Sequence, residues 1–417
     1  MKTKVIATIL FTCAISFLVY GNPENFTVHA QSDLQTTKYR NIVIDLGNGL
    51  ETNARLNLPS IGDGPFPGVL LVHGSGPVDM NETLRYVRID NDTGSIIYPP
   101  GRPFFEIAQY LSERGIAVLQ YDKRGVGANS TILDSNVWGN VTFDDLKQDA
   151  EKALDILMQQ PEVDANKVTL VGHSEGTMIA PRISIDNPDK VDNIVLMGAI
   201  AQNLGIGELG YFQGVTTPLL YAQQILDHNH NGLLSVQEAS ESPVWFVLTQ
   251  NITAANGTSE RLHPQYDMNN DTFISINDEL KPRLIEQLRS ALVVTEGEKC
   301  GLEPCPIWLK SQYSAIPNLD IISKVPFKTS ILIMSGKNDS QTPIQHAFPL
   351  QQKLTEVRHP DHTLITYPDL GHAFYPSSQW LTAAGPIEPK VLQDLFGWLS
   401  DPVRDFKKLT ILSSQIP

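Results

Sequence analysis

The chain has 417 residues, of which 41% are hydrophobic and 18% are charged, and its formal net charge is -15 at pH 7. This hydrophobic fraction excludes a disordered chain, and the acidic balance argues against a nucleic-acid partner, which needs a basic surface to meet phosphates. The length suits one large catalytic domain that carries an insertion.

The N-terminus has the features of a secretory signal. Two lysines precede a predominantly apolar run of 16 residues at 5–20, and Val-His-Ala at 28–30 offers small residues at a cleavage site. We expect residues 1–30 to be a signal peptide, the mature chain to begin near Gln31, and the protein to be secreted or extracytoplasmic. An uncleaved membrane anchor is the alternative, although a span needs about 20 residues.

Two of the three cysteines, Cys300 and Cys305, lie close together in the sequence. A disulfide between them would agree with an oxidising compartment. A metal-binding pair is the less favoured alternative, because no other cysteine remains to complete a site.

Strand and helix patterns alternate along the first half of the chain. Two short strands are predicted at 41–45 and 50–58, around a Gly-Asn-Gly turn. Continuous apolar runs, which are typical of strands buried on both faces of a parallel sheet, occur at 67–73, 116–121, 167–172 and 193–197. Helices are predicted at 103–114, from a Thr142 cap to Leu157, and from Gly176 onward.

The alternation stops near Ile200 and resumes about 120 residues later. The later elements are a strand at 330–334, a helix at 344–357, a strand at 362–367 and a helix at 390–399. This order predicts an α/β fold with a doubly wound, mostly parallel sheet and right-handed crossovers. We expect core segments at 38–200 and 321–417, interrupted by an inserted, mainly helical cap at 201–320.

One pentapeptide stands where a buried strand is expected to turn into a helix. It reads Gly172-His173-Ser174-Glu175-Gly176, a G-x-S-x-G motif. The sharp turn needs glycine on both sides, and it raises the serine hydroxyl above the edge of the sheet. Ser174 is therefore the candidate nucleophile.

A serine hydroxyl becomes an effective nucleophile only when a base takes its proton. In this fold the chain order is serine, acid, histidine. His372 follows the last apolar strand and is preferred as the base. The competitors are His346, which lies in a helical pattern, His359, and His362, which opens a strand.

The remaining parts of such a site are an acid and an oxyanion hole. Asp339 follows the first strand after the insert and is expected to orient the histidine, with Asp320 as the alternative. The expected oxyanion donors are the backbone amides of Glu175 and of Ser75, in the His-Gly-Ser-Gly-Pro stretch at 73–77. An ordinary glycine-rich turn is the alternative for that stretch.

These motifs, together with Tyr-Asp-Lys-Arg-Gly-Val-Gly at 121–127, occur in an order that resembles the α/β-hydrolase superfamily. The likeness is to its serine-aminopeptidase-like and acyl-esterase branch, and it covers about 40–200 and 321–417. The resemblance implies the same triad and oxyanion assignments, and structural roles for Asp122 and Arg124. It also implies cleavage of esters, thioesters or peptides.

Two stretches of the insert match the loop of EF-hand calcium sites. They cover 227–238 and, forty residues later, 267–278. Gly232 stands at the sharp turn of the first loop, and Leu234 and Ile274 fill the apolar eighth position, where two such loops pair. The expected ligands, with backbone carbonyls from the leucine and the phenylalanine, are Asp227, Asn229, Asn231, Leu233, Ser235, Glu238, Asp267, Asn269, Asp271, Phe273, Ser275 and Asp278.

The loops depart from the EF-hand pattern in several places. Thr272 replaces glycine at the sixth position, Asp278 is shorter than the usual glutamate, and Pro243 and Pro264 shorten the flanking helices. We expect structural calcium in the cap, bound weakly with a dissociation constant of roughly 10⁻⁴–10⁻³ M, as in extracellular modules. A pair of polar turns is the alternative.

The sequence predicts a secreted serine hydrolase that cleaves carboxylic esters through an acyl-enzyme, with no cofactor needed for the chemistry. Its partner would be a small acyl ester or a short peptide, and a membrane only if the leader stays uncleaved. An aminopeptidase-like serine peptidase is one alternative. A calcium-binding protein on an inactive hydrolase scaffold is the other.

Overall fold

The computed structural model describes residues 37–84, 88–89, 96–97, 101–203, 208–242, 247–254, 257–291, 306–377 and 385–401. The expected signal peptide and the two neighbouring cysteines lie outside these ranges. Within them, no helix combines the length and the hydropathy needed to cross a membrane.

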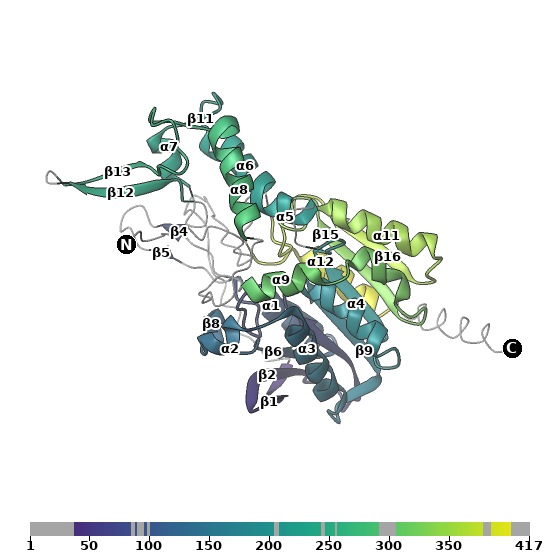
Figure 1. Cartoon of the computed structure of the whole chain (residues 1–417). Helices are drawn as coiled ribbons and strands as arrows, with labels where there is room; N and C mark the ends of the chain where they lie inside the picture. The colour runs from purple at the N-terminus through teal and green to yellow at the C-terminus, as the bar shows by residue number, and fades with distance from the viewer. Residues whose placement is uncertain are drawn as a thin grey trace.

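An eight-stranded sheet forms the centre of the described chain (Figure 1). In spatial order its strands are β1 (Thr37–Gly47), β2 (Leu50–Pro59), β6 (Ala117–Tyr121), β3 (Phe66–Val72), β9 (Val163–His173), β10 (Asn193–Met197), β15 (Ser330–Gly336) and β16 (His362–Tyr367). The pairs from β6 to β16 are parallel, whereas β1, β2 and β6 pair antiparallel. β6, β10 and β15 are buried almost throughout, as is the second half of β9, because helices cover both faces.

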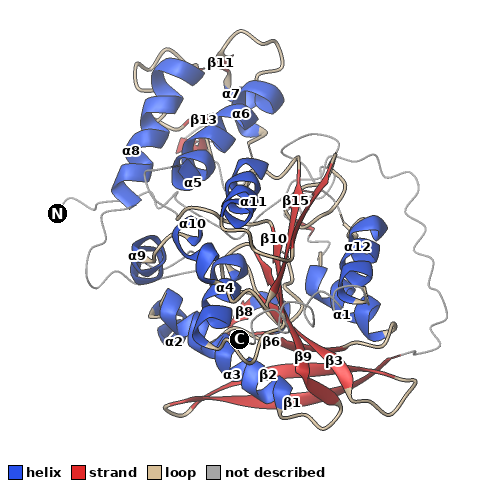
Figure 2. Cartoon of the chain, turned by 90° about the vertical axis from the view of Figure 1, so that its right-hand side faces the viewer, coloured by secondary structure: helices blue, strands red, loops and turns tan. Residues whose placement is uncertain are grey.

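Helices pack on the two faces of this sheet (Figure 2). One face carries α1 (Pro103–Ser112) and α12 (Pro389–Leu399), which share a hydrophobic core with the sheet. The other face carries α3 (Phe143–Met158), α4 (Gly176–Asp186) and α11 (Ala347–Glu356), in a second core. Thr142 caps α3 with a reciprocal bond to Asp145, as the sequence predicted for that residue. The expected doubly wound α/β fold is confirmed.

Short elements connect or extend these layers. The short strands of the core are β4 (Arg88–Ile89), β5 (Ile96–Ile97), β7 (Val126–Gly127) and β8 (Thr131–Ile132). The short helices are α2 (Ser135–Gly139), α10 (Asn318–Ile321), and 3₁₀ turns at Ala128–Ser130, Ile322–Lys324 and Ile344–His346.

Most of the insert forms a lobe beyond the carboxyl ends of the parallel strands, whereas its last helix, α9 (Pro306–Ser314), packs against the core (Figure 1). Its other helices are α5 (Glu208–Tyr211), α6 (Thr217–Tyr221), α7 (Val236–Ser240) and α8 (Lys281–Ala291), with π-helical turns at Phe212–Thr216, Ala222–Leu226 and Ile276–Leu280. Its strands are β11 (Leu233–Leu234), β12 (Thr249–Ala254), β13 (Gly257–Leu262) and β14 (Ile274–Ser275). The lobe has its own hydrophobic core. The expectation of a mainly helical cap missed the β12–β13 hairpin, whose sequence lacks an apolar-polar alternation.

Candidate active site

The G-x-S-x-G motif forms the tight turn between β9 and α4. Ser174 has a φ of 52°, a left-handed conformation that is strained for a serine. A Cβ on Gly172 would lie 2.3 Å from the carbonyl oxygen of Gly176, and a Cβ on Gly176 would lie 2.1 Å from that of Val72. Both glycines are therefore required for strand and helix to approach. The turn holds Ser174 at the carboxyl edge of the sheet, where it is 9% exposed.

The loops after β15 and β16 bring an acid and a histidine together at the same edge. Asp339 Oδ2 lies 2.8 Å from His372 Nδ1, and both residues are buried. Thr342 donates its hydroxyl to Asp339 Oδ2 at 2.7 Å, and the amides of Gln341 and Thr342 donate to Oδ1 at 2.8 Å. Burial alone would raise the pKa of Asp339, but the His372 charge and these bonds bring its pKa below the ordinary value. The acid thus stays ionised beside the imidazole.

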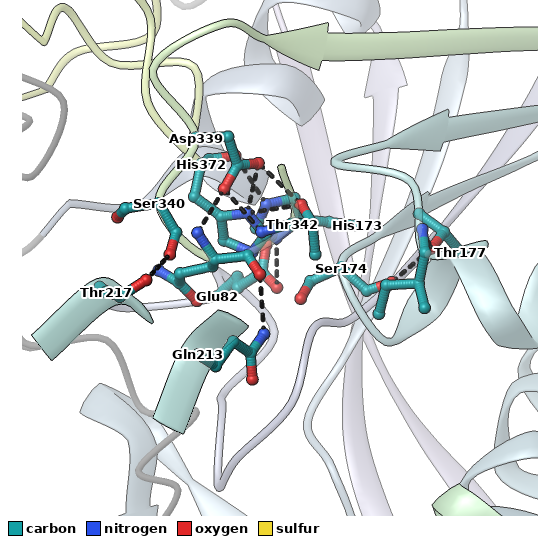
Figure 3. Close-up of polar contacts among 12 residues, drawn as sticks. Glu82, His173, Ser174, Thr177, Gln213, Thr217, Asp339, Ser340, Thr342 and His372 are labelled. Atoms are coloured by element: carbon teal, nitrogen blue, oxygen red, sulfur yellow. Dashed lines mark hydrogen bonds and ion pairs between the residues drawn. The ribbon is translucent and has the colours of Figure 1, made fainter. Parts of the chain in front are cut away.

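Ser174 lies beside the His372–Asp339 pair (Figure 3). The Ser174 amide bonds the carbonyl of Met197 at 2.9 Å, and a Cβ on the next residue, Gly198, would lie 3.1 Å from His372 Cε1. Within the described chain His372 Nε2 is buried without a hydrogen-bond partner. The serine–histidine bond is therefore not formed here, as is common before substrate binds. The unpaired nitrogen can take the proton of the Ser174 hydroxyl.

The competing residues lie elsewhere. His346 accepts a bond from the Ala201 amide at 3.1 Å. His359 and His362 flank the start of β16, at the edge opposite Ser174. Asp320 is an exposed residue of α10.

The two expected oxyanion donors belong to loops that meet at the nucleophile. A Cβ on Gly74, after β3, would lie 3.1 Å from Ser174 Cβ, so this loop packs directly against the serine. Ser75 follows it and is half-buried. Glu175 directly follows the nucleophile and begins α4. This placement agrees with a pair of amides that face one point beside Ser174.

Sequence reasoning missed a buried pair behind the triad. Glu82 Oε1 lies 3.0 Å from His173 Nδ1 and accepts the Gly74 amide at 2.6 Å, while His173 Nε2 lies 3.1 Å from the carbonyl of His372. Burial would raise the pKa of Glu82 and lower that of His173. Their mutual attraction outweighs burial, so the pKa of Glu82 is lowered and the pKa of His173 is raised. No sequence motif identifies Glu82 as part of the site, because a lone glutamate in a loop usually faces solvent.

The Glu82–His173 pair predicts a pH-dependent contribution to stability. The lowered Glu82 pKa stabilises the fold above about pH 4.3 and is lost as pH falls further, whereas the raised His173 pKa stabilises it below about pH 6.5 and is lost as pH rises. We expect Glu82→Gln to reduce the free energy of unfolding by about 1–3 kcal/mol at pH 5.5 and by less at pH 9. Urea unfolding at the two pH values measures this.

A matched control for that experiment is the surface pair of Arg40 and Glu162, whose side chains are 43% and 28% exposed. Glu162→Gln should change stability by less than about 1 kcal/mol at either pH. If Glu82→Gln lost the same free energy of unfolding at both pH values, this would contradict a charged Glu82–His173 pair at pH 5.5.

The insert contacts the acid loop directly (Figure 3). Gln213 Nε2 donates to the Gln341 carbonyl at 2.9 Å, and Thr217 Oγ1 donates to the Ser340 carbonyl at 2.9 Å. Both donors come from the first helical segment of the lobe, and both acceptors neighbour Asp339. The insert is therefore hydrogen-bonded to the loop that carries Asp339.

The two EF-hand-like loops fold alike and pair with each other. The fourth and sixth positions are left-handed in both, with φ of 57° at His230 and Asn270, 79° at Gly232 and 72° at Thr272. β11 and β14 pair antiparallel between the two apolar eighth positions, and the amide of Ile276 bonds the Gly232 carbonyl at 3.0 Å. The first aspartate of each loop accepts backbone amides from within its own loop.

The end of the second loop differs from the expectation. In the first loop Glu238 folds back and accepts the amides of His228 and Ser235 at 3.2 and 2.9 Å. In the second loop Glu279 accepts the amides of Met268, Asn269 and Ser275 at 2.9, 3.2 and 2.8 Å. Asp278 instead bonds the Ser275 hydroxyl. The π-helical turn adds one residue, so Glu279 takes the place in this loop that Glu238 takes in the first, one residue later than the sequence predicts. Asp278 as a calcium ligand stays a prediction.

The described residues contain no group of three or more His, Cys, Asp or Glu side chains placed to hold a metal. The expected ligand sets combine carboxylates with amide, hydroxyl and backbone oxygens, the oxygen donors that calcium takes in proteins. All of the expected calcium ligands remain predictions, Glu238 and Asp278 at the ends of the two loops included. The others are Asp227, Asn229, Asn231, Leu233 and Ser235 in the first loop, and Asp267, Asn269, Asp271, Phe273 and Ser275 in the second.

Two curated esterases are similar to part of this chain. Esterase EstD of Thermotoga maritima is 35% identical over 158 residues, which are 38% of this chain and 32% of that protein. Esterase FrsA of Yersinia pestis is 25% identical over 169 residues, 40% of this chain and 33% of that protein. The chain thus spans about a third of the length of these relatives.

Among solved structures, the hypothetical protein PA2218 of Pseudomonas aeruginosa aligns with a TM-score of 0.49 and 15% identity, over 92% of this chain and 99% of that one. A family model described as the alpha/beta hydrolase fold matches residues 91–378, more than half of the chain. That range contains Ser174, Asp339 and His372. The chain belongs to the α/β-hydrolase fold family.

Proposed function

We propose that this protein is a serine hydrolase that cleaves carboxylic esters through an acyl-enzyme intermediate. The observation that carries the proposal is the buried His372–Asp339 pair, whose free Nε2 lies beside a serine held in a strained turn. The similarity of part of this sequence to two esterases supports carboxylic esters as the substrate class. The partner is then a small molecule rather than a nucleic acid.

In the first half-reaction Ser174 Oγ attacks the ester carbonyl carbon and passes its proton to His372 Nε2. Asp339 holds the imidazole in the tautomer that accepts at Nε2 and stabilises the resulting imidazolium. The amides of Ser75 and Glu175 bind the oxyanion of the tetrahedral intermediate. When that intermediate collapses, the C–O bond breaks, His372 returns the proton to the alcohol, and the acyl group stays on Ser174.

In the second half-reaction water attacks the acyl-enzyme. His372 takes one water proton, the same amides bind the second oxyanion, and collapse releases the carboxylic acid. The proton returns to Ser174 Oγ, so the enzyme ends as it began.

A comparison of p-nitrophenyl esters with aminoacyl p-nitroanilides tests this substrate class. We expect kcat/KM for the ester with the preferred acyl group to exceed that for any anilide by more than about 100-fold. Anilides as the better substrates would replace the proposal by a serine peptidase. An inert protein would favour a calcium-binding scaffold.

We further propose that calcium stabilises the cap and that the protein works outside the cytoplasm. Paired loops with matching backbone conformations support the first part. The signal-like N-terminus supports a location outside the cytoplasm. N-terminal sequencing of the exported protein tests this, and we expect the mature chain to start near Gln31.

Calcium should raise the melting temperature of EDTA-treated protein by at least about 2 °C at 10 mM, because binding at roughly 10⁻⁴ M stabilises a fold by about 2–3 kcal/mol per site. We expect Glu279→Gln to reduce this shift and Asp278→Asn to preserve it. Calorimetric melting of the three proteins measures the effect. A calcium-independent melt would leave two polar turns as the better description.

A further inference from the structure

A further buried ion pair involves Glu175, the residue that follows the nucleophile. Lys123 Nζ lies 3.0 Å from Glu175 Oε2, and the two side chains are 3% and 0% exposed. A pair buried this deeply gives up the hydration of two charges, so stability alone explains it poorly. Its contacts indicate a different role.

The lysine also fixes the loop that precedes one oxyanion donor. Lys123 Nζ donates to the Gly74 carbonyl at 2.6 Å, while the Gly74 amide donates to Glu82 Oε1 at 2.6 Å. Because a trans peptide is planar, holding the Gly74 carbonyl oxygen also fixes the opposite direction of the Ser75 N–H. The peptide plane that carries the first proposed donor is thus set by Lys123.

The glutamate fixes the other donor. The backbone amide of Glu175 is the second proposed oxyanion donor, and its carboxylate is bound on three sides. Besides Lys123, Oε1 accepts Trp308 Nε1 at 2.7 Å and Gln312 Nε2 at 2.9 Å. Both of these donors lie on α9, the last helix of the insert. One cluster therefore joins the β3 loop, the nucleophile turn and the insert.

We propose that Lys123 and Glu175 are a positioning pair that pre-organises the oxyanion hole, with Trp308 and Gln312 as its support from the insert. The inference rests on the proposed ester hydrolysis. Neither side chain touches the reacting atoms in this account. Their effect is exerted through the directions of the Ser75 and Glu175 amides, so it should appear in the transition state more than in substrate binding.

The test uses the whole protein and two probes, a p-nitrophenyl ester as substrate and a trifluoromethyl ketone as a tetrahedral transition-state analogue. We expect Lys123→Met to lower kcat by about 100-fold and to lower the affinity for the ketone by a similar factor. KM should stay within about threefold of the wild-type value. Trp308→Phe, which keeps the ring and removes one donor to Glu175, should lower kcat by about 3- to 10-fold.

Arg124→Met is the matched control. Arg124 is the neighbouring residue and pairs with Asp145 and the buried Asp149 at 2.8 and 2.7 Å, without contact to Gly74 or Glu175. Its loss should lower the melting temperature and leave kcat within about threefold. If Lys123→Met does not fold, Glu175→Gln is measured instead. A kcat lowered at least 10-fold with an unchanged KM supports Lys123 and Glu175 as the positioning pair.

A wild-type kcat and ketone affinity in Lys123→Met, or in Glu175→Gln, would overturn the inference while the enzyme itself remains an active esterase. A wild-type protein inert to both probes would instead refute the proposed function.

Discussion

Ser174→Ala should lower kcat/KM for a p-nitrophenyl ester by about 10⁴- to 10⁶-fold, the range seen when other serine hydrolases lose their nucleophile. The alanine removes the only atom that forms the acyl-enzyme, and the fold loses little, because the hydroxyl oxygen of Ser174 does not hold the turn together. The Ser174 carbonyl, which the alanine retains, bonds the amide and the hydroxyl of Thr177. Steady-state kinetics and a melting curve of the same sample measure both quantities.

Ser184→Ala is a matched control in the helix that follows Ser174. Ser184 is fully buried in α4 and bonds Thr329 Oγ1 at 3.4 Å, away from the site. Its removal should leave kcat within about threefold. Equal activities of Ser174→Ala and the wild type would assign the hydrolysis to another group.

Asp339→Asn should lower kcat by about 10⁴-fold, the effect of the corresponding substitution in a serine protease. An amide at this position can donate to His372 Nδ1, which moves the ring proton to Nε2 and leaves no base facing Ser174. It also removes the charge that stabilises the imidazolium. Asp320→Asn is the control, because Asp320 is the alternative acid and its substitution should leave kcat unchanged. A large loss for Asp320→Asn and none for Asp339→Asn would reverse the assignment.

Much of the core could be predicted because its local signals agree with the global fold. The run Asn193–Met197 forms β10 with the predicted bounds, since a continuous apolar segment suits only a strand buried on both faces. Ser174, Asp339 and His372 could be proposed together because each follows a parallel strand, and the carboxyl ends of those strands share one edge.

The parts that could not be predicted depend on packing between distant segments. Lys123 and Glu175 are charged residues of a kind usually found at the surface, yet they form a buried pair, and Glu175 also bonds Trp308, 133 residues later in the chain. Glu82 is fully buried for the same reason, paired with a histidine 91 residues later. Such pairs have no local pattern, because their burial is decided by which loops the sheet brings together.

The backbone at the end of the second EF-hand-like loop could not be predicted either. A count of twelve residues placed Asp278 at its end, but after a π-helical turn at Ile276–Leu280 it is Glu279 that accepts the loop amides, as Glu238 does in the first loop. Counting loop positions along the sequence assumes that a regular helix follows the loop. Because π-helical turns are rare, no sequence pattern predicted this one.

Labelling with a fluorophosphonate, followed by mass spectrometry of the digested protein, tests the central assignment most directly. We expect one covalent adduct, on the peptide that contains Ser174, and no adduct in Ser174→Ala. An unlabelled wild-type protein, with or without calcium, or an adduct that persists in Ser174→Ala, would contradict the assignment of Ser174 as the activated nucleophile.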